Sequence, residues 1–227
     1  MREAVIHAKQ IAIYGAGGFA REVAWLIQSC NEDGQEFRVV CFIDDDERSH
    51  GKLLNGIPVM GLPEARERFA RAGVVGAVGT PRARQLVTEK AAAAGFQFVT
   101  VIHPRIERSQ WIEIGLGTVI CAGSILTTNI TVGRHVHINL DCTIGHDVVM
   151  GDYTTLAPGV HVSGWVHFGQ RVYVGTGAVI LNGTGEKPLV IGDDVVIGAA
   201  ACVTKSVPPG ITVVGVPARP MRTEKAE

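Results

Sequence analysis

This sequence lacks several features that would place it in a functional class at once. Its 227 residues carry a net charge of −1, so a basic surface for nucleic acid has no support and we expect no nucleic-acid partner. No apolar run approaches the roughly 18 residues that a membrane span requires, and the first residues do not form a signal peptide. We therefore expect a cytoplasmic protein that has no membrane partner.

Aromatic residues and cysteine are also scarce. Aromatics make up 6% of the chain, which disfavours a β-sandwich with an aromatic core. The five cysteines are scattered and form no CxxC pair, so we expect reduced structural thiols. Glycine, by contrast, is abundant at 28 residues, and hydrophobic residues make up 46%. This composition favours a large core with many tight corners and with small or β-branched inward side chains.

Strand-like and helix-like segments alternate over residues 9–100. Along the chain we expect strand 10–15, helix 20–30, strand 38–44, helix 62–73, strand 74–80, helix 83–95 and strand 96–102. Such alternation is typical of a parallel sheet with crossover helices. The sequence therefore predicts a small α/β domain, which we expect to span residues 1–104.

A six-residue repeat follows His103-Pro104. Every sixth residue from Ile114 onward is apolar, which would happen by chance in about one register in ten thousand. The positions are Ile114, Ile120, Leu126, Val132, Ile138, Ile144, Met150, Leu156, Val162, Phe168, Val174 and Ile180. A second column, four residues further on in each hexad, is mostly small or β-branched. Each hexad thus predicts one short strand and one corner, and the whole predicts a parallel β-helix from about Ile112 to Val207.

The register of the repeat breaks once. The inward residue after Ile180 is Ile191, followed by Ile197 and Val203, so extra residues are inserted. We expect Asn182–Pro188 to project as a loop from a corner, and such loops often lie at a binding face. A sandwich of alternating strands is the alternative fold, although a strict period of six is not its signature. The β-helix could also serve as a scaffold without chemistry, which only its sites can decide.

A glycine-rich motif begins the N-terminal domain. The segment GAGGFA, Gly15–Ala20, follows a strand and opens a helix, whose N-terminus could hold a phosphate. Asp44 and Asp45 follow the second strand, where a carboxylate can bind ribose hydroxyls. NAD binding is one interpretation, but a domain that ends near residue 104 lacks a second mononucleotide-binding half.

His146 is the strongest candidate for chemistry. It stands two residues after the inward Ile144, in a corner, so its ring should face outward. Histidine, whose ordinary pKa is about 6.5, can take a proton at neutral pH, and the carboxylate of Asp147 could orient the ring. Gly164 comes 18 residues later, one coil above, where its N–H could meet developing negative charge. An ordinary surface histidine and a plain corner glycine are the alternatives.

The hexads, together with the segment VGVPA (Val214–Ala218), resemble the hexapeptide-repeat acyltransferases. The segments YGAGGFAREV and FIDDD, with His146-Asp147, are similar to one bacterial branch, which acetylates nucleotide-linked amino sugars and includes the sialic acid O-acetyltransferase relatives. The resemblance covers essentially the whole chain. It implies a small Rossmann-like parallel sheet followed by a left-handed parallel β-helix over residues 105–227. It also implies a homotrimer and acetyl-CoA as cosubstrate.

The resemblance assigns roles to individual residues. His146, Asp147 and Gly164 fall at the positions of the catalytic histidine, its acidic neighbour and the N–H donor to the thioester carbonyl. The implied coenzyme contacts are Thr155, Gly164, Thr176, Ala199 and Lys205. The implied contacts to the nucleotide sugar are Gly17, Gly18, Phe19, Asp44, Asp45, Gly79 and Asn139.

Some of these positions depart from the pattern or have a plainer explanation. Thr155 stands where some relatives carry a second histidine, so a hydroxyl can hydrogen-bond there but a second imidazole is excluded. Phe19 replaces a histidine of some relatives, so recognition of the sugar phosphate should differ. Asn139 could be a corner asparagine that tolerates left-handed backbone geometry.

Four histidines of the repeat raise a metal hypothesis, because γ-class carbonic anhydrases share the β-helix. They are His135, His137, His161 and His167. A zinc site needs imidazoles that converge on one point. His161 and His167 are six residues apart and lie on different faces, while His135 and His137 flank an inward residue. We therefore predict no metal.

Three functions remain as hypotheses. The first is an acetyl-CoA-dependent N-acetyltransferase that acts on a nucleotide-linked 4-amino-4,6-dideoxy sugar for surface glycan biosynthesis, with His146 as general base. The second keeps this chemistry but uses a sugar hydroxyl, as in a sialic acid O-acetyltransferase. The third is a nucleotide-sugar-binding scaffold without catalysis.

Overall fold

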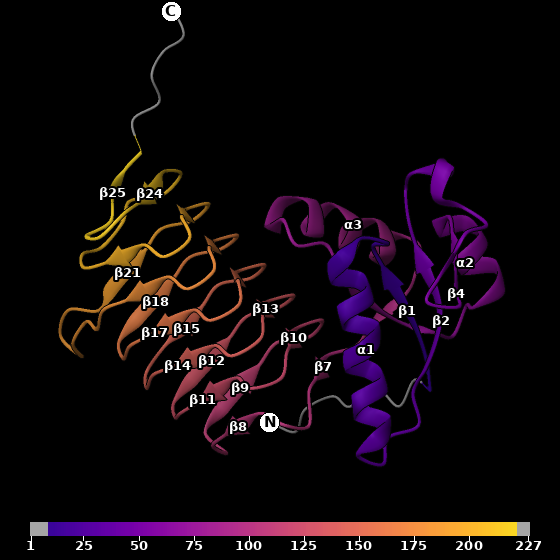
Figure 1. The fold of residues 1–227 in the computed structure, drawn as a ribbon, viewed down its shortest axis with the longest axis horizontal. Helices are drawn as coiled ribbons and strands as arrows, with labels where there is room; N and C mark the ends of the chain where they lie inside the picture. Colours follow the sequence, from indigo (N-terminus) through magenta and orange to yellow (C-terminus); the bar gives the residue numbers. More distant parts are fainter. Residues whose placement is uncertain (1–8, 222–227) are drawn as a thin grey trace, which may run out of the picture.

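The computed structural model describes residues 9–221, which form an α/β domain followed by a three-sided parallel β-helix (Figure 1). No helix of this part of the chain is long and apolar enough to cross a membrane. The cysteines within the described residues are all free thiols, as predicted. Each of the two parts carries one of the candidate sites.

The N-terminal domain holds a sheet of strand order β3-β4-β2-β1-β5-β6. All its pairings are parallel except that of β3 with β4. Its strands are β1 (Gln10–Tyr14), β2 (Arg38–Ile43), β3 (Leu53–Leu54), β4 (Ile57–Met60), β5 (Gly73–Gly76) and β6 (Gln97–Phe98). Its helices are α1 (Gly18–Glu32), α2 (Leu62–Arg68), α3 (Pro81–Ala93) and the short 3-10 helix η1 (Glu47–Ser49). This confirms the predicted parallel α/β fold.

Elements of this domain differ from the prediction at four places. Strand β5 ends at Gly76 instead of near residue 80. The hairpin of β3 and β4 was not expected, although its Asn55-Gly56 turn is a strong hairpin signal, with both residues at positive φ. Helix α2 ends at Arg68 instead of near residue 73, because Phe69 leaves helical geometry. The strand expected over 96–102 is divided between β6 and the first strand of the β-helix, β7 (Val101–Ile102). The first coil thus begins just before the boundary predicted at residue 104.

The β-helix has three sheets, here called sheets 1, 2 and 3. Sheet 1 contains β7, β10 (Val119–Ile120), β13 (His137–Ile138), β16 (Thr155–Leu156), β19 (Tyr173–Val174), β22 (Val196–Ile197), β24 (Thr212–Val214) and the antiparallel β25 (Arg219–Pro220). Sheet 2 contains β8 (Glu107–Arg108), β11 (Ile125–Leu126), β14 (Thr143–Ile144), β17 (His161–Val162), β20 (Val179–Ile180) and β23 (Cys202–Val203). Sheet 3 contains β9 (Ile112–Ile114), β12 (Ile130–Val132), β15 (Val149–Met150), β18 (Val166–Phe168) and β21 (Leu189–Ile191).

The core of the β-helix confirms the predicted register. From Ile120 to Ile180 every residue of the first column is at most 4% exposed, and only Ile114, in the first coil, is partly buried. Residues 18 apart pair directly, as His137 does with Thr155. Between β20 and β21 the chain leaves the coil over residues 181–188, which confirms the predicted loop.

The N-terminal domain packs on sheet 1. Val23, Leu26 and Ile27 of α1 form one apolar cluster with Val101 and Val119 of sheet 1. The turns that join sheet 2 to sheet 3 lie on the side of the β-helix away from this domain, as the positions of β14 and β15 show (Figure 1). The chain therefore presents two separate faces to ligands, one at the α/β domain and one at the far edge of the β-helix.

Candidate active site

His146 lies in the turn between β14 and β15, which joins sheet 2 to sheet 3. The inward residues on either side, Ile144 and Val148, are buried, so the imidazole is left to project outward. Its side chain is 55% exposed. The predicted outward orientation is thus confirmed.

Asp147 holds the imidazole in a defined state. Its Oδ2 lies 2.8 Å from His146 Nδ1. Because a carboxylate can only accept, Nδ1 is the donor of this hydrogen bond, and in the neutral imidazole Nε2 then holds the lone pair. Asp147 has φ of +57°, a left-handed conformation that Asp and Asn adopt more readily than most residues. The arrangement is that of a histidine base with an orienting carboxylate.

Asn129 supports this pair from the coil below, and it is not among the residues predicted from the sequence. Its Nδ2 donates to Asp147 Oδ1 over 3.3 Å, and the Asp147 N–H donates to the carbonyl of Thr128 over 3.2 Å. Asn129 precedes Asp147 by 18 residues, one coil, so the repeat register contained the signal. Both oxygens of the Asp147 carboxylate are therefore fixed by named partners.

Replacing Asn129 with glycine should lower kcat roughly threefold to tenfold with little change in KM, because one hydrogen bond that orients Asp147 is lost. Glycine accepts the φ of +54° at this position without strain, so the coil should be preserved. Steady-state kinetics test this, with Thr128→Val as a control that leaves the side-chain amide of Asn129 in place. An unchanged kcat in Asn129→Gly would show that Asp147 needs no such support.

Gly164 lies against the His146 ring, as the 18-residue register predicted. A Cβ atom built on Gly164 would come within 2.6 Å of His146 Nε2. The carbonyl of Gly164 accepts from the Gly183 N–H over 3.1 Å, whereas the Gly164 N–H has no acceptor within residues 9–221. An N–H without an acceptor could bind an oxyanion beside the base. The predicted role of Gly164 as oxyanion donor therefore stays a prediction that this geometry permits.

The inserted loop packs at the same edge. The ring of Trp165 meets that of His146 edge-on, with centroids 6.2 Å apart. A Cβ on Gly185, within the loop, would lie 3.3 Å from the Trp165 ring. The exposed Lys205 occupies the next turn of the same column, after β23. The loop, Trp165 and Lys205 thus flank His146 along one edge of the β-helix.

The other predicted coenzyme contacts lie elsewhere on the chain. Thr176 and Ala199 are exposed in turns that join sheet 1 to sheet 2, one edge away from His146. Thr155 departs from its prediction in placement, since it is 2% exposed and its hydroxyl bonds Arg84 and the Gly79 carbonyl between the two domains. Its side chain therefore has no surface to offer a coenzyme in a single chain. The structure brings only Gly164 and Lys205 of this set to the edge of His146.

Asn139 also lies in a turn between sheets 1 and 2. It is 8% exposed, and its Nδ2 donates to the Leu156 carbonyl over 3.2 Å. This placement separates it from His146 by one edge of the same coil. Its contact with a sugar stays a prediction.

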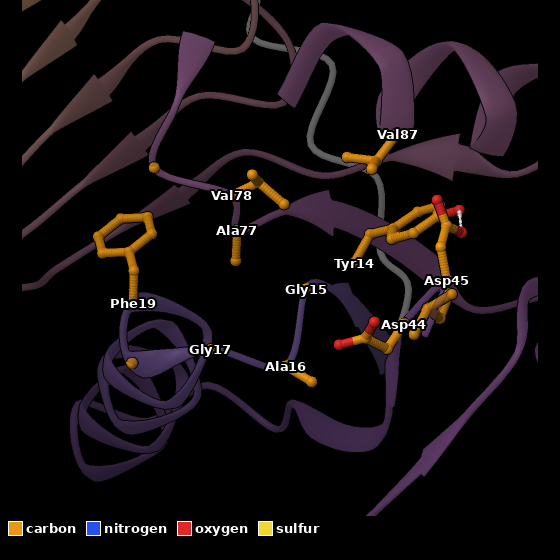
Figure 2. A pocket seen from close by; sticks show the side chains of 13 residues that line it. Tyr14, Gly15, Ala16, Gly17, Phe19, Asp44, Asp45, Ala77, Val78 and Val87 are labelled. Carbon is orange, nitrogen blue, oxygen red and sulfur yellow. Dashed lines mark hydrogen bonds between the residues drawn. The ribbon is translucent and has the colours of Figure 1, made fainter. Parts of the chain in front are cut away.

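The N-terminal domain contains a cavity of about 340 Å³ at the carboxyl ends of its parallel strands (Figure 2). All the substrate contacts that were predicted in this domain line it: Gly17, Gly18, Phe19, Asp44, Asp45 and Gly79. Helix α1 begins at Gly18 without a side-chain cap and with no acidic residue in its first turn. Its unpaired N–H groups and dipole therefore favour an anion here.

The two aspartates of this cavity have different partners. Asp45 accepts from Tyr14 Oη and from Lys90 Nζ, both over 2.6 Å. Although burial opposes it, these hydrogen bonds lower the pKa of the Asp45 carboxyl. Among residues 9–221, the Asp44 carboxylate receives only the Asp46 N–H, at Oδ1 over 2.8 Å, and it points into the cavity (Figure 2). Asp44 is thus the carboxylate left open to a ligand, whereas the Asp45 carboxylate is held in the cavity wall by Tyr14 and Lys90.

The histidines of the metal hypothesis do not converge. No group of His, Cys, Asp and Glu side chains within residues 9–221 could hold a metal ion. His161 Nδ1 lies 2.8 Å from Thr143 Oγ1 on the outer face of sheet 2. His135 and His137 are buried against the N-terminal domain, where burial lowers the pKa of both imidazoles.

Comparisons with known proteins match both halves of the chain. The PglD N-terminal domain family matches residues 10–91. GDP-perosamine N-acetyltransferase of Escherichia coli O157:H7 is 36% identical over 218 residues, which cover 92% of this chain and 95% of that protein.

Two solved structures are similar over nearly the full length. WeeI from Acinetobacter baumannii AYE has 38% identity and a TM-score of 0.84, covering 93% of this chain and 99% of that one. A variant of perosamine N-acetyltransferase from Caulobacter crescentus, in complex with CoA and GDP-perosamine, has 29% identity and a TM-score of 0.84. That match covers 94% of this chain and 97% of the Caulobacter chain.

Proposed function

The chain belongs to the family of hexapeptide-repeat nucleotide-sugar N-acetyltransferases that includes GDP-perosamine N-acetyltransferase, and we propose that it transfers the acetyl group of acetyl-CoA to the amine of a nucleotide-linked 4-amino-4,6-dideoxy sugar. Such a product is a building block of surface glycans. One observation supports the chemistry most directly. The hydrogen bond from His146 Nδ1 to Asp147 leaves Nε2 free beside Gly164.

The proposed reaction is direct transfer. The sugar amine attacks the thioester carbonyl carbon of acetyl-CoA while His146 Nε2 takes a proton from the nitrogen. The imidazolium that forms is stabilised by the Asp147 carboxylate over 2.8 Å. The carbonyl oxygen becomes an oxyanion, for which we assign the open N–H of Gly164 as donor. The C–S bond then breaks, the amide remains on the sugar, and the thiolate of CoA takes up the proton.

We further propose that the active unit is a homotrimer in which neighbouring copies complete each site. In one chain the cavity of the N-terminal domain lies on the side of sheet 1, whereas His146 lies at the edge between sheets 2 and 3. The predicted coenzyme contacts are likewise divided between two edges, with Thr176 and Ala199 apart from Lys205. A neighbouring copy could bring one chain's nucleotide sugar to another chain's His146.

An acetylation assay with several acceptors tests the function. The protein is incubated with acetyl-CoA and with UDP-, GDP- or dTDP-linked 4-amino sugars, and free thiol release is followed. Release that depends on the amine is expected, with an N-acetyl sugar detected by mass spectrometry. Release only with hydroxyl acceptors would instead favour the sialic acid O-acetyltransferase type, and no release with any acceptor would favour a binding scaffold.

Replacing Asp44 with alanine should weaken nucleotide binding about tenfold, because the open carboxylate would lose its hydrogen bonds to the nucleoside. Tyr14→Phe is the matched control, since it removes only the hydrogen bond from Tyr14 to Asp45 and should change nucleotide affinity little. Isothermal titration with GDP and with UDP measures both variants. Equal losses in the two variants would contradict the division of roles between Asp44 and Asp45.

A further inference from the structure

Arg84 of α3 is a fully buried cation at the junction of the two domains. It is 0% exposed, although arginine is rarely buried without a partner. Its guanidinium donates to groups of both domains. The acceptors are the carbonyls of Val78, Gly79, His135, Tyr153 and Thr154, the hydroxyl of Thr155 and Nδ1 of His137.

None of these acceptors carries a charge. No carboxylate within residues 9–221 forms an ion pair with Arg84, and burial lowers the pKa of its guanidinium to about 9, which leaves it cationic at neutral pH. Removing a charge from water without an opposite charge is expensive. A buried cation of this kind is therefore expected to serve a ligand or a structural demand.

The cavity of the N-terminal domain, by contrast, has anionic side chains and no cationic one in its lining. Its lining residues include Asp44 and Asp45 but no lysine and no arginine. A nucleotide sugar carries a diphosphate, and proteins bind phosphate groups with cations and with open N–H groups. Among the described residues the lining thus offers open N–H groups, at the N-terminus of α1 and at Val78 and Gly79, but no cation.

Arg84 lies directly behind the wall of this cavity. Its Nη1 donates to the carbonyls of Val78, over 2.9 Å, and Gly79, over 3.3 Å, and both residues line the cavity. The negative ends of these two peptide dipoles thus face the guanidinium.

A second route links Arg84 to the end of the cavity where α1 begins. The ring of His137 lies 4.8 Å from that of Phe19, at the start of α1, and its Nδ1 accepts from Arg84. Arg84 is thus connected to the cavity lining both through the Val78–Gly79 backbone and through the neighbouring rings of His137 and Phe19.

We propose that Arg84 is the positive charge that holds the substrate's diphosphate, acting across the Val78–Gly79 backbone while it ties the cavity to the β-helix. This role rests on the proposed function, because it requires a diphosphate ligand. Arg84 does not touch the ligand, so it is a positioning residue with an electrostatic effect. Its field in the protein interior is screened less than that of a surface lysine would be.

Paired titrations of nucleotide and nucleoside test the charge separately from the fold. In Arg84→Met, affinity for GDP or UDP should fall roughly tenfold or more, while affinity for guanosine or uridine stays near that of the wild type. Thr88→Val is the control, because it removes a buried hydroxyl of α3 that donates to the Arg84 carbonyl over 3.0 Å and leaves the guanidinium and its acceptors in place. Its ratio of nucleotide to nucleoside affinity should match that of the wild type.

Other outcomes would overturn the inference. Equal losses of affinity for nucleotide and nucleoside in Arg84→Met would mean that Arg84 has only a structural role. Unchanged affinity for both would mean that Arg84 plays no part in ligand binding. If Arg84→Met fails to fold, Arg84→Lys replaces it, and a collapse of the affinity ratio despite the retained charge would contradict the proposal. A wild-type protein that binds neither GDP nor UDP would instead refute the proposed function itself.

Discussion

Replacing His146 with alanine is expected to lower kcat roughly a hundredfold to ten-thousandfold, because the sugar amine would lose its proton acceptor in the transition state. KM for both substrates should change little, since most of the contacts proposed for the coenzyme and the nucleotide lie elsewhere on the chain. The ring is 55% exposed and lies against Gly164 and Trp165 at the edge of the β-helix, so its loss leaves no cavity in the core. Steady-state kinetics with a thiol reagent, together with a thermal melt, measure both quantities.

His161→Ala is the matched control for this variant. His161 is an exposed histidine on sheet 2, and within the described residues its ring has one hydrogen-bond partner, Thr143. It lies on β17, whereas His146 follows β14 in the coil below. We expect its removal to leave kcat within about twofold of the wild type. Undiminished turnover in His146→Ala would mean that another group takes the proton.

The β-helix was predictable because its signal is local and repeated. Each hexad repeats the same pattern of inward residues, so an exception at one position does not obscure the period. The longer step from Ile180 to Ile191 was then enough to locate the inserted loop. The N-terminal domain offered fewer constraints per element. The division of residues 96–102 between two sheets depends on where β7 meets β10, which no short window of sequence contains.

The site around His146 and the site around Arg84 also differ in how far the sequence could predict them. His146 and Gly164 could be related by counting one coil, and Asn129 could have been found by the same count in the other direction. Arg84 could not, because its acceptors in the β-helix are 51 to 71 residues away and are mostly backbone carbonyls. A lone arginine on a helix normally indicates a solvated face, and only the packing of α3 on sheet 1 reveals the buried charge.

Replacing Gly164 with alanine should lower kcat by roughly a hundredfold while changing the free energy of unfolding by less than about 1 kcal/mol. The added Cβ would lie 2.5 Å from Cε1 and 2.6 Å from Nε2 of His146, so the ring must move. These atoms belong to the end of a half-exposed side chain, and the coil itself can stay in place. The displaced ring would lose its 2.8 Å hydrogen bond to Asp147 and its position beside the substrate.

Gly145→Ala provides the contrast, since its Cβ would meet the backbone atoms of Gly164 and Ser163 at 2.7 and 2.8 Å. A backbone collision cannot be relieved by a rotamer change, so we expect a clear loss of stability there. Thermal melts and kinetics on both variants separate the two effects. A fully active Gly164→Ala would place the reacting amine away from this face of the ring. Because alanine keeps the main-chain N–H, the variant tests the space around Nε2 and leaves the oxyanion donor in place.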